Sequence, residues 1–251
     1  MEIKREDIIS RLNDRFINDD TVYAFWLEGA DAIGTIDSYS DLDIWFDIKD
    51  GFEDLFIKQL KNALSNISSI DFFYEKEHLH PKIRQLFFHL EETSDFLIID
   101  LCIQSHSRKI EFTIENKDEE VKVIFDKANV TKYRHLNMSA FKIKLNNRIE
   151  ELSKTYKFFS LWVIKEIKRG NYLEAFNYYH TYILNPLVEL CRIKNQPTKK
   201  DYRLKHIKRD LPIDLVEELE NLYKISSLKE IEQKTKEAIL FFKKIMEGFS
   251  K

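Results

Sequence analysis

The sequence contains no stretch of about 18 consecutive apolar residues, so we expect no membrane-spanning helix. Its first residues, Met-Glu-Ile-Lys-Arg-Glu-Asp, lack the apolar core of a secretory signal peptide. Cysteine is scarce: Cys102 and Cys191 lie far apart, each within an apolar run. Both are therefore expected to be reduced core thiols in a cytoplasmic protein and not partners in a disulfide.

Glycine and proline are also rare, with 5 and 4 residues, and we find no internal repeat. No Cys/His spacing typical of a metal site occurs. The remaining composition is that of a globular protein, 43% hydrophobic and 33% charged. A chain of 251 residues is long enough for one large domain or two small ones.

Charge is distributed unevenly along the chain. Residues 1–130 hold 15 Lys and Arg against 28 Asp and Glu, whereas residues 131–251 hold 25 against 15. An acidic half followed by a basic half indicates two domains, and the basic one could face a polyphosphate held by the acidic one. Alternatively, both are solvated surfaces that attract one another.

The spacing of apolar residues predicts helices mixed with strands up to about residue 130, an α/β or α+β domain. The predicted elements are helices over 2–18 and 52–66, strands at Val22–Leu27, Ile70–Tyr74 and Val121–Phe125, and a hairpin of Arg84–Leu90 and Phe96–Ile103. After His135 the pattern is helical throughout, which predicts an all-α bundle. Its predicted helices cover 138–169, 171–193, 213–224 and 228–247.

The stretch from Trp26 to Ile48 carries the chemistry: a strand that ends at Gly29, a turn with a half-helix, and a second strand with Asp41 and Asp43. Residues i and i+2 of a strand share a face, so two like charges would lie together among apolar neighbours. Divalent cations would resolve that conflict, and Mg²⁺ favours carboxylates together with substrate phosphates. Gly29 would let the backbone approach a phosphate, and a helix over 30–33 would offer free N–H groups. The alternative is an acidic surface loop.

A further carboxylate, Asp100, lies inside the almost wholly apolar run Phe-Leu-Ile-Ile-Asp-Leu-Cys-Ile. One charge in a buried strand is costly unless it is paired or bound to metal. The residues alone leave two possibilities open for Asp100, a bound metal ion or an ion pair with a Lys or Arg. Histidines that could also be ligands, but more plausibly lie on a hairpin face, are His78, His80 and His89.

The string from Gly29 to Asp43, Gly-Ala-Asp-Ala-Ile-Gly-Thr-Ile-Asp-Ser-Tyr-Ser-Asp-Leu-Asp, resembles the signature of the DNA polymerase β-like nucleotidyltransferases. Its spacing is similar to that of the bacterial antibiotic nucleotidyltransferases and their relatives, and residues 161–172 are similar to a helix pair of the lincosamide enzymes. One departure is Ala30, which stands where the family has Ser. Residues 123–127 also resemble a segment of these relatives, with Asp126 expected to cap the strand.

The resemblance implies an α+β fold: a mixed-sheet nucleotidyltransferase domain at 1–130, then a helical bundle at 131–251 for acceptor binding or dimerisation. It implies transfer of a nucleoside monophosphate, AMP from ATP, to a hydroxyl of a small molecule such as an aminoglycoside or lincosamide. Two Mg²⁺ ions would be held by Asp41, Asp43 and Asp100. Nucleotide contacts are expected at Gly29, Ala30, Ser40, Asp41 and Asp43, and weaker acceptor contacts at Glu166 and Glu174.

Two other functions stay open at the level of sequence. A weak or inactive nucleotidyltransferase fold could serve as an interaction protein, as antitoxins do beside HEPN-type toxins. The toxin signature of Arg and His separated by 4–6 residues is absent from 131–251, where Arg203 and His206 are too close. A template-independent RNA polymerase is the third reading, and the acidic balance argues against a nucleic-acid partner. A membrane partner is not expected, and a homodimer stays open.

Overall fold

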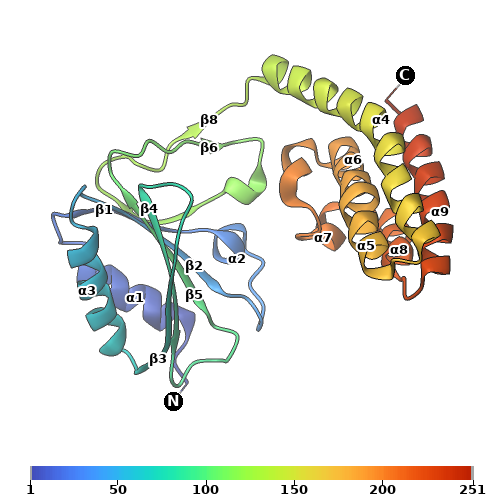
Figure 1. The fold of residues 1–251 in the computed structure, drawn as a ribbon. Coiled ribbons are helices and arrows are strands. Elements are labelled where there is room, and N and C mark those ends of the chain that lie inside the picture. The colour runs from blue at the N-terminus through green and yellow to red at the C-terminus, as the bar shows by residue number, and fades with distance from the viewer. Residues whose placement is uncertain (1, 250–251) are drawn as a thin grey trace. The chain divides into compact units, whose positions relative to one another are not determined.

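The computed structural model describes residues 2–249. The chain forms two compact units, Met1–Leu136 and Asn137–Lys251, which are described separately (Figure 1). The division falls after the predicted position 130 because strand β8 (Tyr133–Arg134) pairs with β6 (Phe112–Thr113). Residues 131–136 therefore fold with the first unit.

The first unit is built on a six-stranded sheet with the order β3-β4-β5-β2-β1-β7. β2 and β5 run parallel and the other neighbours are antiparallel, so the predicted mixed sheet is confirmed. The strands are β1 (Val22–Leu27), β2 (Leu42–Ile48), β3 (Ile70–Lys76), β4 (Ile83–Leu90), β5 (Ile99–Ser105) and β7 (Lys122–Asp126).

One face of this sheet is covered by α1 (Arg5–Phe16) and α3 (Glu53–Ser65), which lie beside each other in Figure 1. Successive side chains of β2 point to opposite faces of the sheet, and every second residue of this strand is apolar. Leu42, Ile44, Phe46 and Ile48 are fully buried in the core below these helices. The residues between them face the other side of the sheet, where the short helix α2 (Gly29–Ile33) precedes β2.

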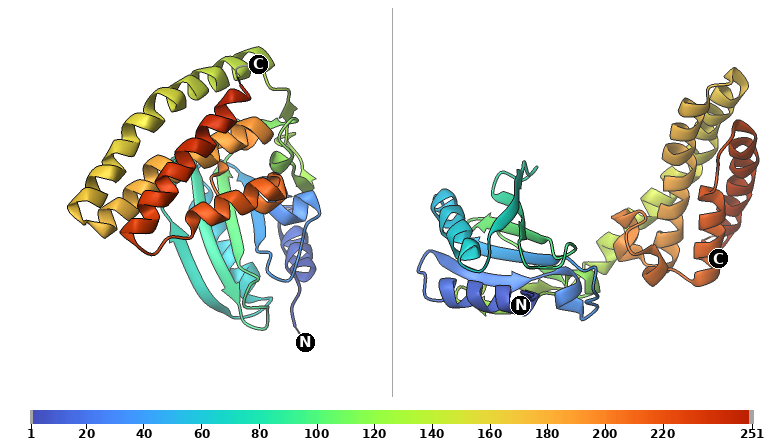
Figure 2. Two further views of the ribbon diagram at one scale, coloured as in Figure 1. Left: turned by 90° about the vertical axis from the view of Figure 1, so that its right-hand side faces the viewer. Right: turned by 90° about the horizontal axis from the view of Figure 1, so that it is seen from below.

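The second unit is wholly helical among its described residues, as the sequence predicts. Its helices are α4 (Met138–Arg169), α5 (Tyr172–Tyr178), the π-helical segment η2 (Tyr179–Leu184), α6 (Asn185–Asn195), the 3₁₀ segment η3 (Pro197–Tyr202), α7 (Ile207–Asp210), α8 (Ile213–Tyr223) and α9 (Leu228–Glu247). Figure 2 shows α4, α5 and α9 side by side from two directions. They enclose one apolar core that includes Tyr179 and Leu187.

Most predicted elements are present, and one boundary is wrong in an informative way. β5 begins at Ile99 and not at Phe96, because residues 94–98 form turns in which Phe96 and Ile98 are exposed. The helix predicted over 171–193 is interrupted by the π-helical segment, which periodicity alone does not reveal.

No helix within residues 2–249 is long and apolar enough to cross a membrane.

Candidate active site

The link between β1 and β2 brings Gly29 against Asp43. Gly29 has a φ of +60°, and a Cβ built on it would lie 2.0 Å from Oδ2 of Asp43. Only glycine fits, because any side chain would collide with the carboxylate and L-residues avoid this backbone region. The Glu28 N–H also donates to the Asp43 carbonyl at 3.1 Å. The first turn of α2 is thereby fixed beside this carboxylate.

Asp43 and Asp100 are direct neighbours across the parallel pair β2 and β5. Adjacent strands lie about 4.8 Å apart, and residues in register project to the same face. Gln85 on β4 donates from Nε2 to both Asp100 oxygens, at 2.9 and 3.0 Å. A neutral amide from the next strand therefore orients the second carboxylate without cancelling its charge.

Asp41 lies just before β2, which begins at Leu42, so the predicted pairing of Asp41 with Asp43 on one strand is only approximate. Its side chain is exposed, and its carbonyl accepts a hydrogen bond from Arg5 at 3.3 Å. The Ser40 hydroxyl donates to Asp37 at 2.9 Å, within the turn between α2 and β2. The predicted nucleotide-binding hydroxyl is thus already part of that turn.

Arg5 holds this turn in place, and sequence reasoning missed it. It is 9% exposed and forms an ion pair of 2.6 Å with Asp31, which is 6% exposed on α2. Its second nitrogen donates to the Ser40 carbonyl at 2.6 Å. Burial raises the Asp31 pKa despite the guanidinium. One cation from α1 therefore fixes both α2 and the segment leading into Asp43.

Further charges surround the two carboxylates. Cys102 follows Asp100 on the same face of β5, and burial raises its thiol pKa, with the neighbouring charges of Asp100, Glu28 and Asp43 adding to the effect. Arg108 lies over the Trp45 ring at 5.9 Å, and its pKa is lowered by burial while Glu28 opposes that shift. The carboxylates of Asp43, Asp100 and Glu28 thus lie near one partly buried guanidinium, that of Arg108.

A second polar network continues along the same face. Asp47 is fully buried and accepts from Gln104 at 2.6 Å, and its other oxygen lies 2.6 Å from Nδ1 of His106. Arg108 donates to the carbonyl oxygen of the Gln104 side chain. Burial raises the Asp47 pKa. This chain of contacts links Asp47 to the guanidinium beside the candidate site.

The other predicted residues have varied surroundings. Asp126 accepts bonds from Ala128, Val130 and Thr131, which confirms its predicted role as a cap. His89 pairs with Asp71 on β3 at 2.8 Å. Glu166 is buried and accepts from Asn171 at 2.8 Å and Arg169 at 2.9 Å at the end of α4, whereas Glu174 is exposed.

No group of three His, Cys, Asp or Glu side chains within residues 2–249 is arranged to hold a metal ion. The pair formed by Asp43 and Asp100 is a smaller donor set. Such a pair suits Mg²⁺, which is commonly held by one or two carboxylates together with substrate phosphates. At position 29 the pair is approached by peptide backbone alone, because Gly29 has no side chain.

Comparison with known proteins finds no matching family model and no matching curated protein. Solved structures do match, at low identity. Aminoglycoside 6-adenyltransferase from Bacillus subtilis shares 15% identity at a TM-score of 0.39, covering 98% of this chain and 89% of that one. Spectinomycin adenyltransferase from Enterococcus faecialis, solved with ATP and spectinomycin, shares 13% at 0.36, covering 99% and 100%. A nucleotidyltransferase-like protein from Exiguobacterium sibiricum shares 12% at 0.37, covering 98% and 75%. Nucleotidyltransferases are thus among the structures to which this chain is similar.

Proposed function

We propose that the protein transfers a nucleoside monophosphate, AMP from ATP, to a hydroxyl of a small molecule at the face of the sheet that carries Asp43 and Asp100. The observation that carries the proposal is the joint placement of Gly29, Asp43 and Asp100. A glycine at positive φ touches one carboxylate, and the second carboxylate lies beside it in register. The motif around Gly29 supports the same reaction.

Asp43 and Asp100 would hold Mg²⁺, with Asp41 as a third ligand from the segment just before β2. When bound, such ions activate the attacking hydroxyl and stabilise the departing pyrophosphate. Gln85 keeps the Asp100 carboxylate oriented toward the face. Arg5 restrains the Ser40–Asp41 backbone, so that the ligand-bearing segment keeps its position when phosphate enters.

The phosphate chain of the nucleotide would lie against the backbone of Gly29 and Ala30, where no side chain intervenes. A serine at position 30 would add one charge-assisted hydrogen bond. Such a bond is worth about 1.5–3 kcal/mol. We expect the Ala30→Ser variant to bind ATP with Mg²⁺ about tenfold to a hundredfold more tightly. The natural protein would then bind the nucleotide, but more weakly than the Ala30→Ser variant does.

The acceptor is proposed to be an aminoglycoside-like or lincosamide-like antibiotic, the class that the motif implies. The helical unit would supply acceptor contacts or a dimer interface. Of the two predicted acceptor carboxylates, exposed Glu174 is the better candidate, because Glu166 already accepts hydrogen bonds within its own helix end.

Pyrophosphate release tests the proposal directly. The purified full chain is incubated with Mg²⁺, each nucleoside triphosphate and a panel of aminoglycoside and lincosamide acceptors. Acceptor-dependent release that disappears in Asp43→Asn supports the transferase. Absence of release together with absence of ATP binding would favour an interaction protein with a nucleotidyltransferase fold. Ala30, which replaces the family's serine, is the residue that favours that second candidate.

A further inference from the structure

The face of the sheet that carries Asp43 and Asp100 changes from carboxylates to aromatic rings along one row of paired residues. Asp43 on β2 pairs with Asp100 on β5, and Asp100 pairs with Phe87 on β4. Phe87 pairs with Tyr74 on β3, the strand at one edge of the sheet. Residues that are paired in register project to the same face, at about 4.8 Å per strand, so Tyr74 lies about 14 Å from Asp43. The aromatic side chains therefore continue the proposed site.

A groove of about 480 Å³ lies at the aromatic end of this row. Its lining residues are Phe72, Tyr74, Phe87, His89, Asp95 and Ile98. Phe72 and Tyr74 are 54% and 53% exposed, although burial of such rings would be favourable. The rings of Tyr74 and Phe87 are nearly parallel, at 23°, with their centroids 6.4 Å apart. A hollow with apolar walls and few polar groups is typical of a small-molecule site.

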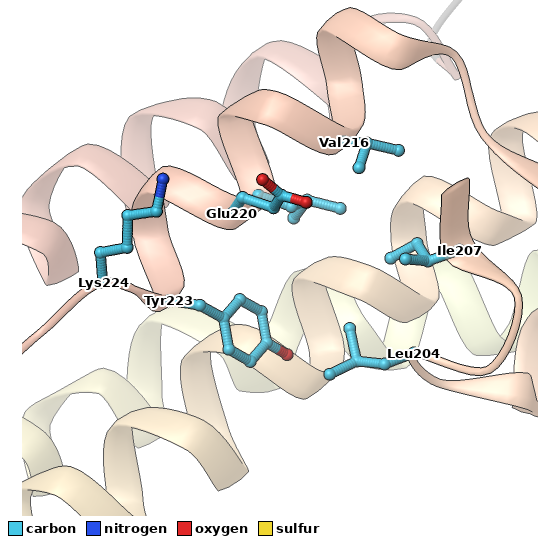
Figure 3. Close-up of a pocket in the computed structure, with 7 residues that line it drawn as sticks. Leu204, Ile207, Val216, Glu220, Tyr223 and Lys224 are labelled. Carbon is cyan, nitrogen blue, oxygen red and sulfur yellow. The ribbon is translucent and has the colours of Figure 1, made fainter.

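The cavity beside α8 in the helical unit has no such connection to the carboxylates. Figure 3 shows its lining residues Leu204, Ile207, Val216, Glu220, Tyr223 and Lys224. Its volume is about 330 Å³, and its one carboxylate, that of Glu220, is paired with Lys208 at 3.0 Å. None of the residues proposed to hold metal or nucleotide lines this cavity. The groove on β3 and β4 is therefore the better candidate for a substrate of the proposed reaction.

The direction of the transfer reaction places the acceptor at the aromatic end of the row. The acceptor oxygen would bond to the α-phosphorus, the bond from this phosphorus to pyrophosphate would break, and the hydroxyl proton would pass to solvent. The attacking and leaving oxygens lie on opposite sides of the phosphorus. The proposed phosphate contact, Gly29, follows β1 on one side of β2, whereas β5 and β4 lie on the other side. The acceptor would thus approach from beyond Asp100, and the nucleoside, held by a third oxygen, would extend away from this line.

The charge of the groove favours a cation. Nδ1 of His89 lies 2.8 Å from Asp71, and although burial alone would lower the pKa of His89, its contact with Asp71 helps to raise it. Asp95 is then left over, because it is exposed and has no ion pair among residues 2–249. Lys76, the lysine of β3 on the same face, does not line the groove. The faces of aromatic rings also attract cations.

We propose, on the basis of the transfer reaction above, that this groove holds the body of the acceptor, an alcohol with one positive charge and an apolar ring. The ring would lie against Phe72 and Tyr74, the positive charge would lie near Asp95, and a hydroxyl would reach toward Asp100. Among antibiotic acceptors, this chemistry fits a lincosamide-like molecule better than a polycationic aminoglycoside, which offers little apolar surface to cover the rings. Phe72, Tyr74 and Phe87 would then determine acceptor specificity.

Lincomycin and kanamycin test this chemistry with the full-length protein. Lincomycin carries one amine and an alkyl-substituted ring, whereas kanamycin carries several amines and little apolar surface. Calorimetry without nucleotide should show that lincomycin binds at least about tenfold more tightly. In methyl NMR, lincomycin should shift Ile98, which lines the groove, and should leave Ile99, which is buried on the other face of the sheet. No binding, equal affinities or an unshifted Ile98 would overturn the proposal.

Adjacent residues of β3 provide matched variants, because they lie on opposite faces of the sheet. Tyr74→Ala removes a ring from the groove at a half-exposed side chain of the edge strand, so the fold should persist. We expect lincomycin affinity to fall about tenfold and ATP affinity to hold, with a raised KM for the acceptor and an unchanged kcat. Phe73→Ala is the control: its ring contacts Phe88 and Lys61 on the core side, so it should lower the melting temperature and keep lincomycin affinity. An equal loss of affinity in both variants would contradict the groove.

Asp95→Asn isolates the contribution of charge. Affinity for lincomycin should fall about two- to fivefold, as expected for one exposed ion pair, and the difference should shrink at high salt. Glu91→Gln, in the same link between β4 and β5, is the control, because Glu91 is exposed and does not line the groove. An Asp95→Asn variant with unchanged affinity would refute the positive charge of the occupant.

Two readouts separate this groove from the transfer reaction itself. Lincomycin that binds and shifts Ile98, without pyrophosphate release when ATP and Mg²⁺ are present, would support the groove as a binding site and contradict the transfer. Pyrophosphate release with an acceptor KM that is unchanged in Tyr74→Ala would support the transfer and overturn the groove. A loss of ATP affinity in Tyr74→Ala would assign the groove to the nucleobase, and a loss of dimer in light scattering would assign it to a second copy of the chain. Either result would also overturn the proposal.

Discussion

The two faces of the six-stranded sheet are made from alternate residues of the same strands, yet they differ in chemistry. Toward α1 and α3 the strands present mainly aliphatic and aromatic side chains, with Arg84 and Ser105 in contact with the first turn of α3. The other face carries Asp43, Asp47, Asp100 and Gln104 beside a smaller apolar cluster around Trp26. Burial of apolar surface stabilises the fold, whereas burial of carboxylates costs stability unless each is hydrogen-bonded. One face therefore supports the structure and the other contains the candidate site.

Substitution of neighbouring residues on β2 should separate these roles most strongly. Asp43→Asn is expected to reduce nucleotidyl transfer by about 10²-fold or more, because a metal ligand is lost. Its free energy of unfolding without metal should hold or rise, since like-charge repulsion falls. Ile44→Val is the control from the core face: it should cost about 0.5–1.5 kcal/mol of stability and keep transfer. Urea unfolding and pyrophosphate release measure both. A variant Asp43→Asn with normal activity would refute the division of roles.

The next largest effect concerns Arg5, the residue of α1 that holds α2 and the segment before Asp43 in place. Arg5→Met leaves buried Asp31 without its partner, and removal of one member of a buried pair costs about 3–5 kcal/mol. Arg15→Met on the same helix should cost less than about 1 kcal/mol, because its contact with Asp19 is long, at 3.9 Å, and partly exposed. Equal losses in denaturant unfolding would show that Arg5 does not anchor the turn.

Gly29, the first residue of α2, and Gly34, the residue that follows its end, provide a comparison at the two ends of one short helix. Both have positive φ, +60° and +72°, but only a Cβ at Gly29 meets the Asp43 carboxylate. Gly34→Ala should cost about 1–2 kcal/mol from backbone conformation alone. Gly29→Ala should cost about 2–4 kcal/mol, because displacement of the carboxylate adds to that.

A double-mutant cycle isolates the second contribution. Adding Asp43→Ala should restore part of the stability lost in Gly29→Ala and nothing in Gly34→Ala. If both glycine variants respond alike, the carboxylate does not lie against Gly29.

The sequence was most informative where the deciding pattern is local. Gly29 and Asp43 belong to one motif, and the long helices α4 and α9 have the predicted bounds because apolar spacing persists over many turns. These features depend on residues close together in the chain.

Partners distant in sequence were missed. Arg5 reaches Asp31 and Ser40 from another helix, and Gln85 reaches Asp100 from a neighbouring strand. Asp47 was not distinguished from other acidic residues, because its burial depends on Gln104 and His106 more than fifty residues away. Only the pairing of strands, which no local pattern contains, brings such side chains together.

The smallest predicted effect is a pH dependence of the free energy of unfolding that comes from Asp47. Burial raises the Asp47 pKa above the ordinary 3.8, so the folded state holds this proton more tightly than the unfolded state. Its contribution to stability is present below 3.8 and is lost as pH rises through the raised value. Asp47→Asn should therefore gain stability relative to the wild type as the pH rises above 3.8. A relative loss over that range, in urea unfolding at each pH, would contradict the assignment.

The central claim is that Asp43 and Asp100 hold the metal ions that accompany a nucleotide. Mn²⁺ titrated into the ¹⁵N-labelled protein with ATP tests this through paramagnetic line broadening, without any need for an acceptor. We predict that the Gly29, Asp43 and Asp100 amides broaden first, at substoichiometric Mn²⁺, and that Asp43→Asn abolishes the effect. Broadening that is strongest at half-buried His78 and exposed His80, and unchanged in Asp43→Asn, would contradict the claim.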